Sequence, residues 1–344
     1  MWFTNLCAWR LRDADALPAA EELAERLETK AFVPCGPHAT ESIGWVAPAH
    51  GVHESLVHTA MDRHLICVQI ESKVLPASVV RDFVEDEIEE LQNQQQRKLR
   101  AAERQEIKER VTLELLPRAF SRTKRIHALI DHKAGWILIN ASSAKQAETL
   151  TGFLRETVGT LPITPIMTKS PPHAAFGRWL AGEEPGHNFT LATDCELREP
   201  GDGGAVVRVS NFELLSPEVQ QHLQGGLNAV KVGVNWDEKI DLQLADDLIL
   251  RRLRFSETLD SDDTDDDPAA RFDADFALMS ETLLSLVNAT MNVLGGEAIG
   301  LAETDSKAAD TAPIQATEAT EATEATEATE ATEATEATEA TEAF

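Results

Sequence analysis

The sequence predicts an α+β fold with mixed and antiparallel sheets, helices packed against them, and a helical arm inserted in the N-terminal half. In residues 230–236 and 240–244, apolar residues alternate with polar ones, which is typical of antiparallel strands with one solvated face. In residues 80–91 the apolar residues recur at helical spacing and form one stripe. Strand-like and helix-like segments are mixed along the first half, as in an α+β layer.

With 344 residues the chain has room for two domains, or for one large domain with an insertion. No run of about 18 apolar residues is present, so no transmembrane helix is expected. The N-terminus lacks a basic region followed by an apolar core, so no signal peptide is expected. The four cysteines form no CxxC pair, which predicts free thiols in a cytoplasmic protein: Cys7, Cys35, Cys67 and Cys195.

The first half is expected to form one layer of strands and helices. Prolines and glycines in residues 31–48 exclude a long regular element, although Trp45 and Val46 either enter a strand or anchor the loop. Residues 159–175 are rich in proline and mark a boundary. The other expected elements are strands at 2–11 and 64–70, a helix at 21–30, a hairpin of 126–130 with 136–140, and a helix at 143–158.

The second half is expected to be rich in antiparallel strands. The alternating runs are followed by a third, at residues 248–255, and by a long apolar helix at 272–294 that two glycines close. The other expected elements are helices at 176–181 and 217–224 and a strand at 206–209.

Residues 73–125 are interpreted as the helical arm. Pro76 suits a helix entry, because its fixed φ matches a helix and its missing N–H needs no partner there. Two helices, or one long broken helix, are expected before Pro117 ends the pattern. The apolar residues of the pattern are Val80, Phe83, Val84, Ile88 and Leu91, then Leu99, Ile107, Val111 and Leu115.

The charge of this arm changes sign along its length. Its first part is acidic, whereas residues 97–125 hold ten cations and four anions, a net charge of +6 in a chain of formal charge −28. One interpretation is a solvated helix with i,i+4 ion pairs such as Glu106 with Arg110. The alternative is a surface for nucleic acid, because the segment from Arg118 to Arg125 contains no acid.

Much of the negative charge lies in two short segments. Residues 257–267 contribute −7, and residues 303–344, with nine Ala-Thr-Glu repeats, contribute −11. Local fields therefore decide whether the chain can bind a polyanion. A period of three gives no constant helix face, so residues 301–344 are expected to be a disordered tail that either only solvates the chain or competes with DNA.

No set of residues predicts a metal site or a catalytic site. The spacing of His50, His53, His58, His64 and Cys67 matches neither a zinc finger nor an HExxH helix. No GxSxG sequence frames a nucleophile. We therefore expect no enzyme, no metal and no cofactor, with a metal hydrolase built on the histidines as the alternative that metal analysis would test.

Two segments are distinctive, LLPRAFSR at 115–122 and RFDADF at 271–276. Together with further segments in unchanged order from residue 1 to about 298, they resemble the bacterial recombination-associated RdgC family. The Ala-Thr-Glu tail lies outside the family pattern. The further segments are MWFTNL at 1–6, FVPCG at 32–36, GWVAP at 44–48, Leu75–Pro76, SAKQAE at 143–148, GTLP at 159–162 and LGGEA at 294–298.

The resemblance implies a ring-shaped homodimer with a positively lined hole, through which duplex DNA passes without sequence preference. It also implies a nucleoid-associated protein that restrains RecA by occupying DNA. Phe120 would then be a plug into the partner subunit, and the strand-rich second half the other dimer contact. From the residues alone, Phe120 is as well explained as a cap on the core of its own helix.

The DNA-binding residues expected from charge and resemblance come mostly from the arm. Four of them match basic family positions: Arg97, Lys98, Arg100 and Arg118. The full expected set is Arg97, Lys98, Arg100, Arg104, Lys108, Arg118, Arg122, Lys124, Arg125, Lys231 and Lys239.

The expected domains are 1–72 plus 126–170 as an N-terminal α+β domain, 73–125 as the arm, 171–300 as a strand-rich C-terminal domain, and 301–344 as the tail. One departure from the family pattern is Ser210, Asn211 and Phe212, where a lysine pair and a glutamine are often found. This departure argues against DNA contacts from the edge of the second half that follows the strand at 206–209. The alternative function is a protein-interaction scaffold whose arm forms a coiled coil with a partner helix, without DNA binding.

Overall fold

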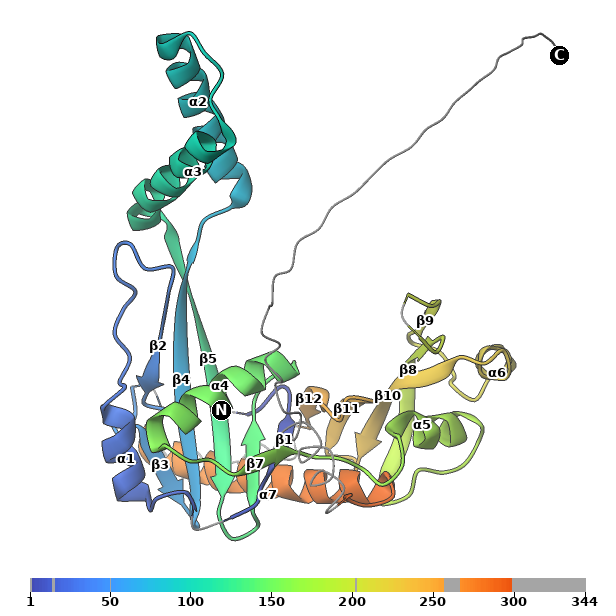
Figure 1. Ribbon diagram of the computed structural model, residues 1–344. Coiled ribbons are helices and arrows are strands. Elements are labelled where there is room, and N and C mark those ends of the chain that lie inside the picture. The colour runs from blue at the N-terminus through green and yellow to red at the C-terminus, as the bar shows by residue number, and fades with distance from the viewer. Residues whose placement is uncertain (1, 14–15, 50, 202, 257–266, 299–344) are drawn as a thin grey trace, which may run out of the picture. The chain divides into compact units, whose positions relative to one another are not determined.

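The computed structural model describes residues 2–13, 16–49, 51–201, 203–256 and 267–298. Residues Met1–Ile299 form one compact unit, and Gly300–Phe344 form a second unit that lies outside the described residues. The expected disordered tail and nearly all of the acidic run at 257–267 therefore lie outside the described residues. The described part confirms an α+β fold with two antiparallel sheets (Figure 1).

The first sheet has seven strands in the order β2-β4-β5-β6-β1-β7, with β3 paired to the first residues of β4. The central strands β4 and β5 pair along their whole length, from Arg63 opposite Asp131 to Val74 opposite Phe120. The strands are β1 (Cys7–Leu11), β2 (Glu41–Val46), β3 (Val57–Ala60), β4 (Arg63–Val74), β5 (Phe120–Asp131), β6 (Trp136–Ile139) and β7 (Ile163–Pro165).

Both faces of this sheet are covered. On one face Ile66 and Ile126 pack with α1 (Ala20–Glu28) and α4 (Ala144–Val158) in a hydrophobic cluster. On the other face Leu65 and Leu129 belong to a second, larger cluster. Because neighbouring side chains of a strand point to opposite faces, the continuous apolar runs of β4 and β5 fit a strand that is buried on both sides.

The second sheet has five strands in the order β12-β11-β10-β8-β9. Its helices are α5 (Pro172–Leu180), α6 (Pro217–Gln224) and α7 (Pro268–Val293), and α5 contacts β10. Pro217 begins α6 at a position where its missing N–H needs no partner. The strands are β8 (Phe189–Arg198), β9 (Val206–Val209), β10 (Asn228–Trp236), β11 (Ile240–Ala245) and β12 (Arg251–Phe255).

One hydrophobic cluster crosses the expected domain boundary near residue 170. It includes Leu65 and Leu129 of the first sheet, Val232 and Leu242 of the second, and Leu283 of α7. The largely apolar surface of α7 fits a helix that is covered by both sheets. The division into an N-terminal and a C-terminal domain stays a prediction.

The residues between β4 and β5 form two helices. Of the two expected arrangements, two helices or one long broken helix, the first is confirmed. They are α2 (Ala77–Gln95) and α3 (Ala101–Leu115), followed by a short 3-10 turn at Leu116–Arg118. The two helices share a small core of Leu99, Ile107 and Val111 with Val84, Ile88, Leu91 and Leu115. The predicted apolar stripe is therefore largely covered by the partner helix of the same chain, although Phe83 is half exposed.

The helical pattern expected between Pro76 and Pro117 is confirmed, but the ends of the expected arm, residues 73–125, are strands. Lys73 and Val74 belong to β4, and Phe120 to Arg125 belong to β5, so Arg122, Lys124 and Arg125 lie on a strand. The segment has no apolar alternation of its own, because both of its faces carry polar side chains. It is a strand because β4 pairs with it in register along its whole length.

Three strands were missed, and one was placed too early. β7 was not expected because it lies in the proline-rich segment 159–175. The first strand begins at Cys7 rather than at residue 2. β3 was not expected because it has only four residues. β8 was not expected because Asp194 and Glu196 interrupt its apolar residues and a bulge breaks its register against β10. In the described part, no helix combines the length and apolar character needed to cross a membrane.

Candidate nucleic-acid interface

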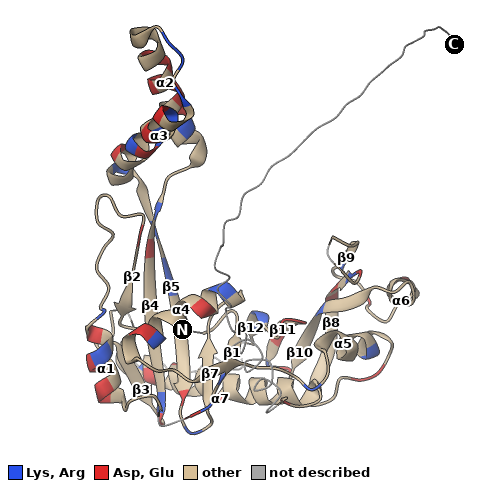
Figure 2. Ribbon diagram, viewed as in Figure 1, with Lys and Arg blue, Asp and Glu red and all other residues tan. Residues whose placement is uncertain are grey.

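Strands β4 and β5 continue beyond the buried part of the sheet and carry basic side chains there (Figure 2). Along β5 the side chains of Phe120, Arg122 and Lys124 share one face, because strand residues alternate in direction. The same face continues into Ile126, which is buried in the sheet core. Arg125 lies on the opposite face, where its Nε donates to Oε1 of Gln69 at 2.9 Å.

Most of the expected DNA-binding residues have no carboxylate partner. In the described part of the chain, no salt bridge involves Lys98, Arg100, Arg104 or Lys108 around α3, and none involves Arg118, Arg122, Lys124 or Arg125 near the base of the helix pair. All of these side chains are exposed except Lys124, which is partly buried. Unpaired cations keep their full charge for an external anion, so these eight residues are the strongest candidates for phosphate contacts.

The neighbours Arg122 and Lys124 also influence each other. Burial lowers the pKa of Lys124, and the positive charge of Arg122 lowers it further. A phosphate placed between the two would offset this repulsion, because an opposite charge favours the ionised amine.

Arg97 has a different role in the structure. Its guanidinium donates to both oxygens of Glu103, at 2.9 and 2.5 Å. The Arg97 hydrogen bond, together with the backbone N–H of Arg100, lowers the pKa of Glu103 to about 2. Glu103 thereby closes the first turn of α3, where the helix dipole favours a carboxylate.

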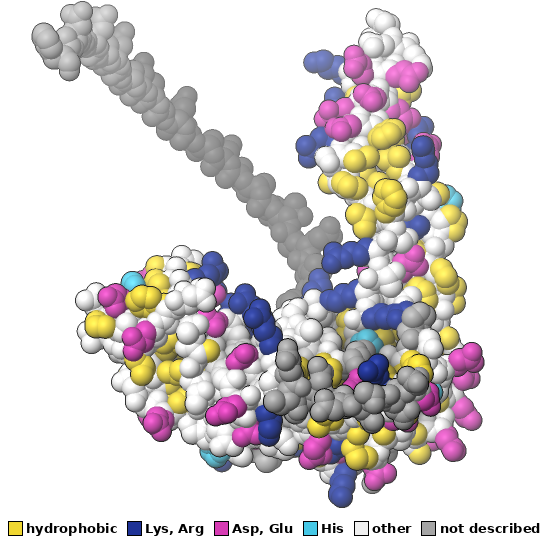
Figure 3. Space-filling view, turned by 180° about the vertical axis from the view of Figure 1, so that it is seen from behind, with side chains coloured by type: hydrophobic (Ala, Val, Ile, Leu, Met, Phe, Trp, Pro, Cys, Tyr) yellow, Lys and Arg dark blue, Asp and Glu magenta, His cyan; other side chains and the backbone are white. Residues whose placement is uncertain are grey.

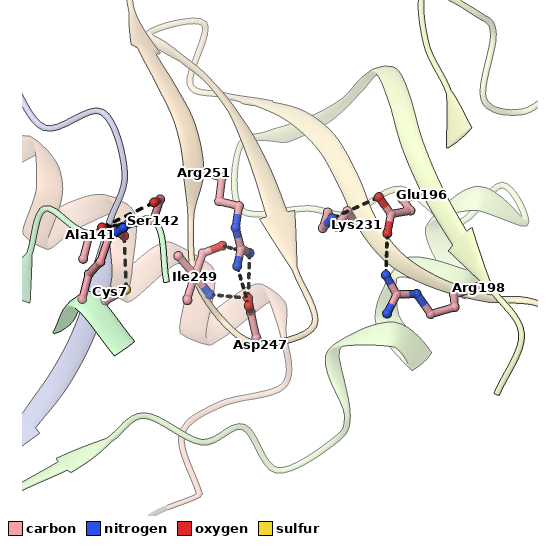
Figure 4. A network of polar contacts seen from close by, with 10 residues as sticks. Cys7, Ala141, Ser142, Glu196, Arg198, Lys231, Asp247, Ile249 and Arg251 are labelled. Carbon is pink, nitrogen blue, oxygen red and sulfur yellow. Dashed lines mark hydrogen bonds and ion pairs between the residues drawn. The ribbon is translucent and has the colours of Figure 1, made fainter. Parts of the chain in front are cut away.

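The two expected residues of the second sheet are also paired. Lys231 lies 3.0 Å from Glu196, which accepts from Arg198 and Arg208 as well, and Figure 4 shows Lys231 and Arg198 converging on it. Burial would raise the pKa of Glu196, but the hydrogen bonds from these cations outweigh it and lower the pKa to about 2. Lys239 is 2.5 Å from Asp237. Lys231 is therefore engaged by a buried carboxylate and Lys239 by a partly exposed one, and a role in DNA binding stays a prediction for both.

The expected DNA-binding set does not include Arg252 and Arg254 of β12. They line a polar pocket of about 300 Å³ together with Asn211, Asp194 and Gln243. Arg252 has a positive φ of 56° where the register of β11 against β12 shifts. Such a bulge redirects side chains, and the sequence carries no clear signal for it.

Phe120 lies at the start of β5, between Arg118 and Arg122, and is 86% exposed. It does not belong to the core of the helix pair, so the interpretation of Phe120 as a cap on that core was wrong. Val74, its partner on β4, is also exposed. An exposed phenylalanine and valine side by side form a small apolar anchor in a basic surrounding.

Figure 3 shows Lys and Arg side chains following one another along the edge of the β4–β5 extension, next to the apolar patch near the helix pair. Arg122 and Lys124 lie on β5, and Arg118 lies in the turn just before it. Arg97, Lys98 and Arg100 lie at the turn between the two helices, and Arg104 and Lys108 lie along α3. Lys231 and Lys239 belong to the other sheet.

The histidines of the sequence do not form one group. His53 and His58 approach each other and Asp273, whereas His64 contacts His132 and Thr59. Cys67 is buried, and burial raises its pKa to about 12, so it is not a thiolate at neutral pH. His50 lies outside the described residues.

Comparison with known proteins places this architecture in a family. Residues 1–297 match the family model described as "Putative exonuclease, RdgC". The chain is similar to the recombination-associated proteins RdgC of Serratia proteamaculans (39% identical over 301 residues, 87% of this chain and 99% of the relative) and Aeromonas hydrophila (38% over 300 residues, 86% and 99%). The relative from Shewanella halifaxensis is 38% identical over 300 residues, 86% of this chain and 98% of its own length.

The match covers both sheets, the helix pair and α7, and it stops before the Ala-Thr-Glu repeats. The names of these relatives refer to recombination and give no enzyme class, whereas the description of the family model does. The chain belongs to the RdgC family of recombination-associated proteins.

Proposed function

We propose that this chain binds double-stranded DNA without sequence preference and acts as a ring-shaped homodimer in the nucleoid, where it limits the access of RecA to DNA. The observation that carries the proposal is the set of unpaired cations on α3 and β5 beside the exposed Phe120. These side chains would contact phosphates, which position a duplex but carry no sequence information.

The overall negative charge does not oppose this proposal. Salt screens charges beyond about 8 Å at physiological ionic strength, so a phosphate responds to the cations close to it. The segment from Arg118 to Arg125 has four cations and no acid. Ion pairs elsewhere, such as Lys231 with the buried Glu196, reduce the charge that other cations can offer to a duplex.

The competing scaffold function is less well supported. The apolar stripe of α2 packs against α3 of the same chain, so a partner helix would have to displace α3 to reach it. A coiled coil with another protein needs a free stripe. The exposed residues left on the helix pair, such as Phe83 and Leu113, do not form a continuous heptad pattern.

The test is a salt titration of duplex binding by the full chain and two matched variants. Arg122→Ala removes an unpaired cation, and Lys239→Ala removes a paired one. We expect Arg122→Ala to weaken binding to all sequences alike and to flatten the plot of log K against log salt by about 0.9 for one lost phosphate contact. Lys239→Ala should leave the slope unchanged.

A strong base preference, or a slope that stays the same after Arg118, Arg122 and Lys124 are all replaced by alanine, would contradict the proposal. We also propose that the chain does not degrade the DNA that it binds. Incubation of end-labelled duplex with the chain and Mg²⁺ or Mn²⁺ tests this. We expect the label to stay on full-length DNA, and progressive shortening that follows the protein through purification would refute it.

The dimer is tested separately with Phe120→Ala. Because the Phe120 side chain is 86% exposed, its loss should not unfold the subunit. We expect the dimer dissociation constant, measured by analytical ultracentrifugation, to rise at least tenfold. An unchanged constant would remove Phe120 from the interface but leave the DNA test intact.

A further inference from the structure

Three potential metal ligands from distant parts of the sequence meet at one end of the first sheet. His53 precedes β3, His58 lies in β3, and Asp273 lies near the start of α7. Their ligand atoms all lie within 4.8 Å of one another, and no other group of three His, Cys, Asp or Glu residues in the described ranges is as close.

The distances are close to those of an occupied site. Nε2 of His58 lies 3.4 Å from Oδ1 of Asp273, and Nε2 of His53 lies 3.9 Å from the same oxygen. Ligands that each lie about 2.0 Å from a tetrahedral ion are separated by about 3.3 Å. Small side-chain rotations would therefore complete the geometry, and Asp273 is 57% exposed and free to make them.

The Nε2 atoms of the two histidines form no hydrogen bond in the described part of the chain. Both of these atoms, in His53 and His58, are buried. The His58 side chain is only 9% exposed. A buried polar atom without a partner is uncommon in folded proteins and indicates a place for a bound water or ion.

Aromatic rings hold the His58 imidazole in place. The edges of Phe272 and Phe276 lie against it, with ring centroids 4.8 and 5.0 Å away. The His53 ring stacks on it at 5.6 Å with an interplanar angle of 19°. Burial lowers the pKa of His58 and the nearby His53 lowers it further, whereas Asp273 opposes the shift.

The surrounding elements fix these positions. His58 is paired to Leu65 of β4, and the carbonyl of Ala49 accepts from the N–H of His53. α7 is anchored to the sheet by Arg63, which donates to Ser280 at 3.0 Å and to Asp131 at 3.1 Å. The backbone positions of the three ligands are thereby fixed, so it is mainly the Asp273 side chain that must become ordered when an ion binds.

We propose that His53, His58 and Asp273 bind one divalent transition-metal ion, for which zinc is the best fit, and that this ion fastens the β3 segment to the start of α7. Two imidazoles and one carboxylate suit zinc and its neighbours in the first transition row, whereas calcium and magnesium prefer oxygen ligands. A fourth position stays open to water. The inference replaces the expectation of no metal site.

This site is separate from the candidate DNA-binding surface. His58 is opposite Leu65 of β4, and Arg122 is opposite Ser72 of the same strand. Seven residues of a strand span roughly 23 Å. The metal would therefore act on the stability of the α7 contact and not on phosphate binding.

The test uses the full chain without a histidine tag, treated with a chelator and titrated with Zn²⁺ and with Co²⁺. We expect one ion per chain and the intense visible absorption of tetrahedral cobalt. Asp273→Asn and His53→Ala each remove one ligand and should weaken binding about tenfold or more. The matched controls are Asp275→Asn, two residues along α7, and His38→Ala, an exposed histidine elsewhere.

A second measurement separates binding from folding. Zinc should raise the thermal midpoint of the wild-type chain, because an ion that binds only the folded state stabilises it, and should leave the Asp273→Asn midpoint unchanged. Circular dichroism checks that each variant is folded, and the exposed position of Asp273 makes its variant the safer one. The absence of a stoichiometric ion in the wild type, or equal affinity in the double variant His53→Ala/Asp273→Asn, would overturn the proposal.

Discussion

Glu196 offers a quantitative test of the electrostatics in the second sheet. It is 5% exposed on β8 and accepts hydrogen bonds from Lys231, Arg198 and Arg208. We predict that Glu196→Gln, which keeps the shape but removes the charge, destabilises the chain at pH 7. The loss should be visible in urea unfolding as a lower midpoint with an unchanged slope.

The magnitude follows from the pKa. A change from 4.5 to about 2 corresponds to about 3.4 kcal/mol at most, since each pKa unit is worth about 1.36 kcal/mol. The side chains of Arg198 and Arg208 are 49% and 72% exposed, so solvent screens their part of the interaction. We therefore expect about 1–2 kcal/mol.

The pH dependence has a definite sign. Because the folded-state pKa is lowered, the carboxylate contributes its full stability above about pH 5, near its unfolded pKa. That contribution is lost as the pH falls toward 2. The difference in unfolding free energy between wild type and Glu196→Gln should therefore shrink from pH 7 to pH 3.

A control separates burial from charge. Asp237→Asn breaks the more exposed pair with Lys239 and should cost less than about 0.5 kcal/mol at pH 7. Equal urea midpoints for wild type and Glu196→Gln at pH 7, or a difference that does not change between pH 7 and pH 3, would refute the reasoning.

Three further predictions concern other parts of the chain. Ile107→Ala removes a 5% exposed side chain from the helix-pair core and should cost about 2–4 kcal/mol locally, so hydrogen exchange should quicken in α2 and α3 but not in the strands of the first sheet. Burial raises the pKa of Cys7 and Cys67 to about 12 and that of Cys195 to about 11, so iodoacetamide at pH 8 should modify Cys35 first, as read by mass spectrometry of the folded protein. Leu286→Ala on α7 should lower the global unfolding free energy by about 2–5 kcal/mol in urea, because Leu286 is fully buried in the cluster that both sheets share.

Periodicity predicted the elements that have one apolar face. The helix at 217–224 and the strand at 206–209 have the predicted bounds, and the hairpin around residues 131–136 is confirmed. Periodicity did not predict the secondary structure where pairing with a distant strand overrides the local sequence pattern. The outer half of β5 is polar on both faces and is a strand only because β4 lies beside it.

The candidate site shows a second limit of the sequence. The sequence shows which residues are basic, but it does not predict which of them form ion pairs with carboxylates. Arg97 meets Glu103 six positions along the chain, and Lys231 meets Glu196 from a different strand. The sequence also did not predict the proposed metal-ligand group, because Asp273 lies near His58 only through the packing of α7 against β3.

Ion pairing, more than the number of basic residues, therefore defines the surface that a polyanion can use. A cation already bonded to a carboxylate must break that bond before it gains a phosphate, so its net contribution to DNA binding is small. Arg118 and Arg122 face no such cost in the described part of the chain, whereas Lys231 does. In a chain of net charge −28, duplex binding would thus be confined to the helix pair and the β5 base, next to the exposed Phe120 that we assign to the dimer contact.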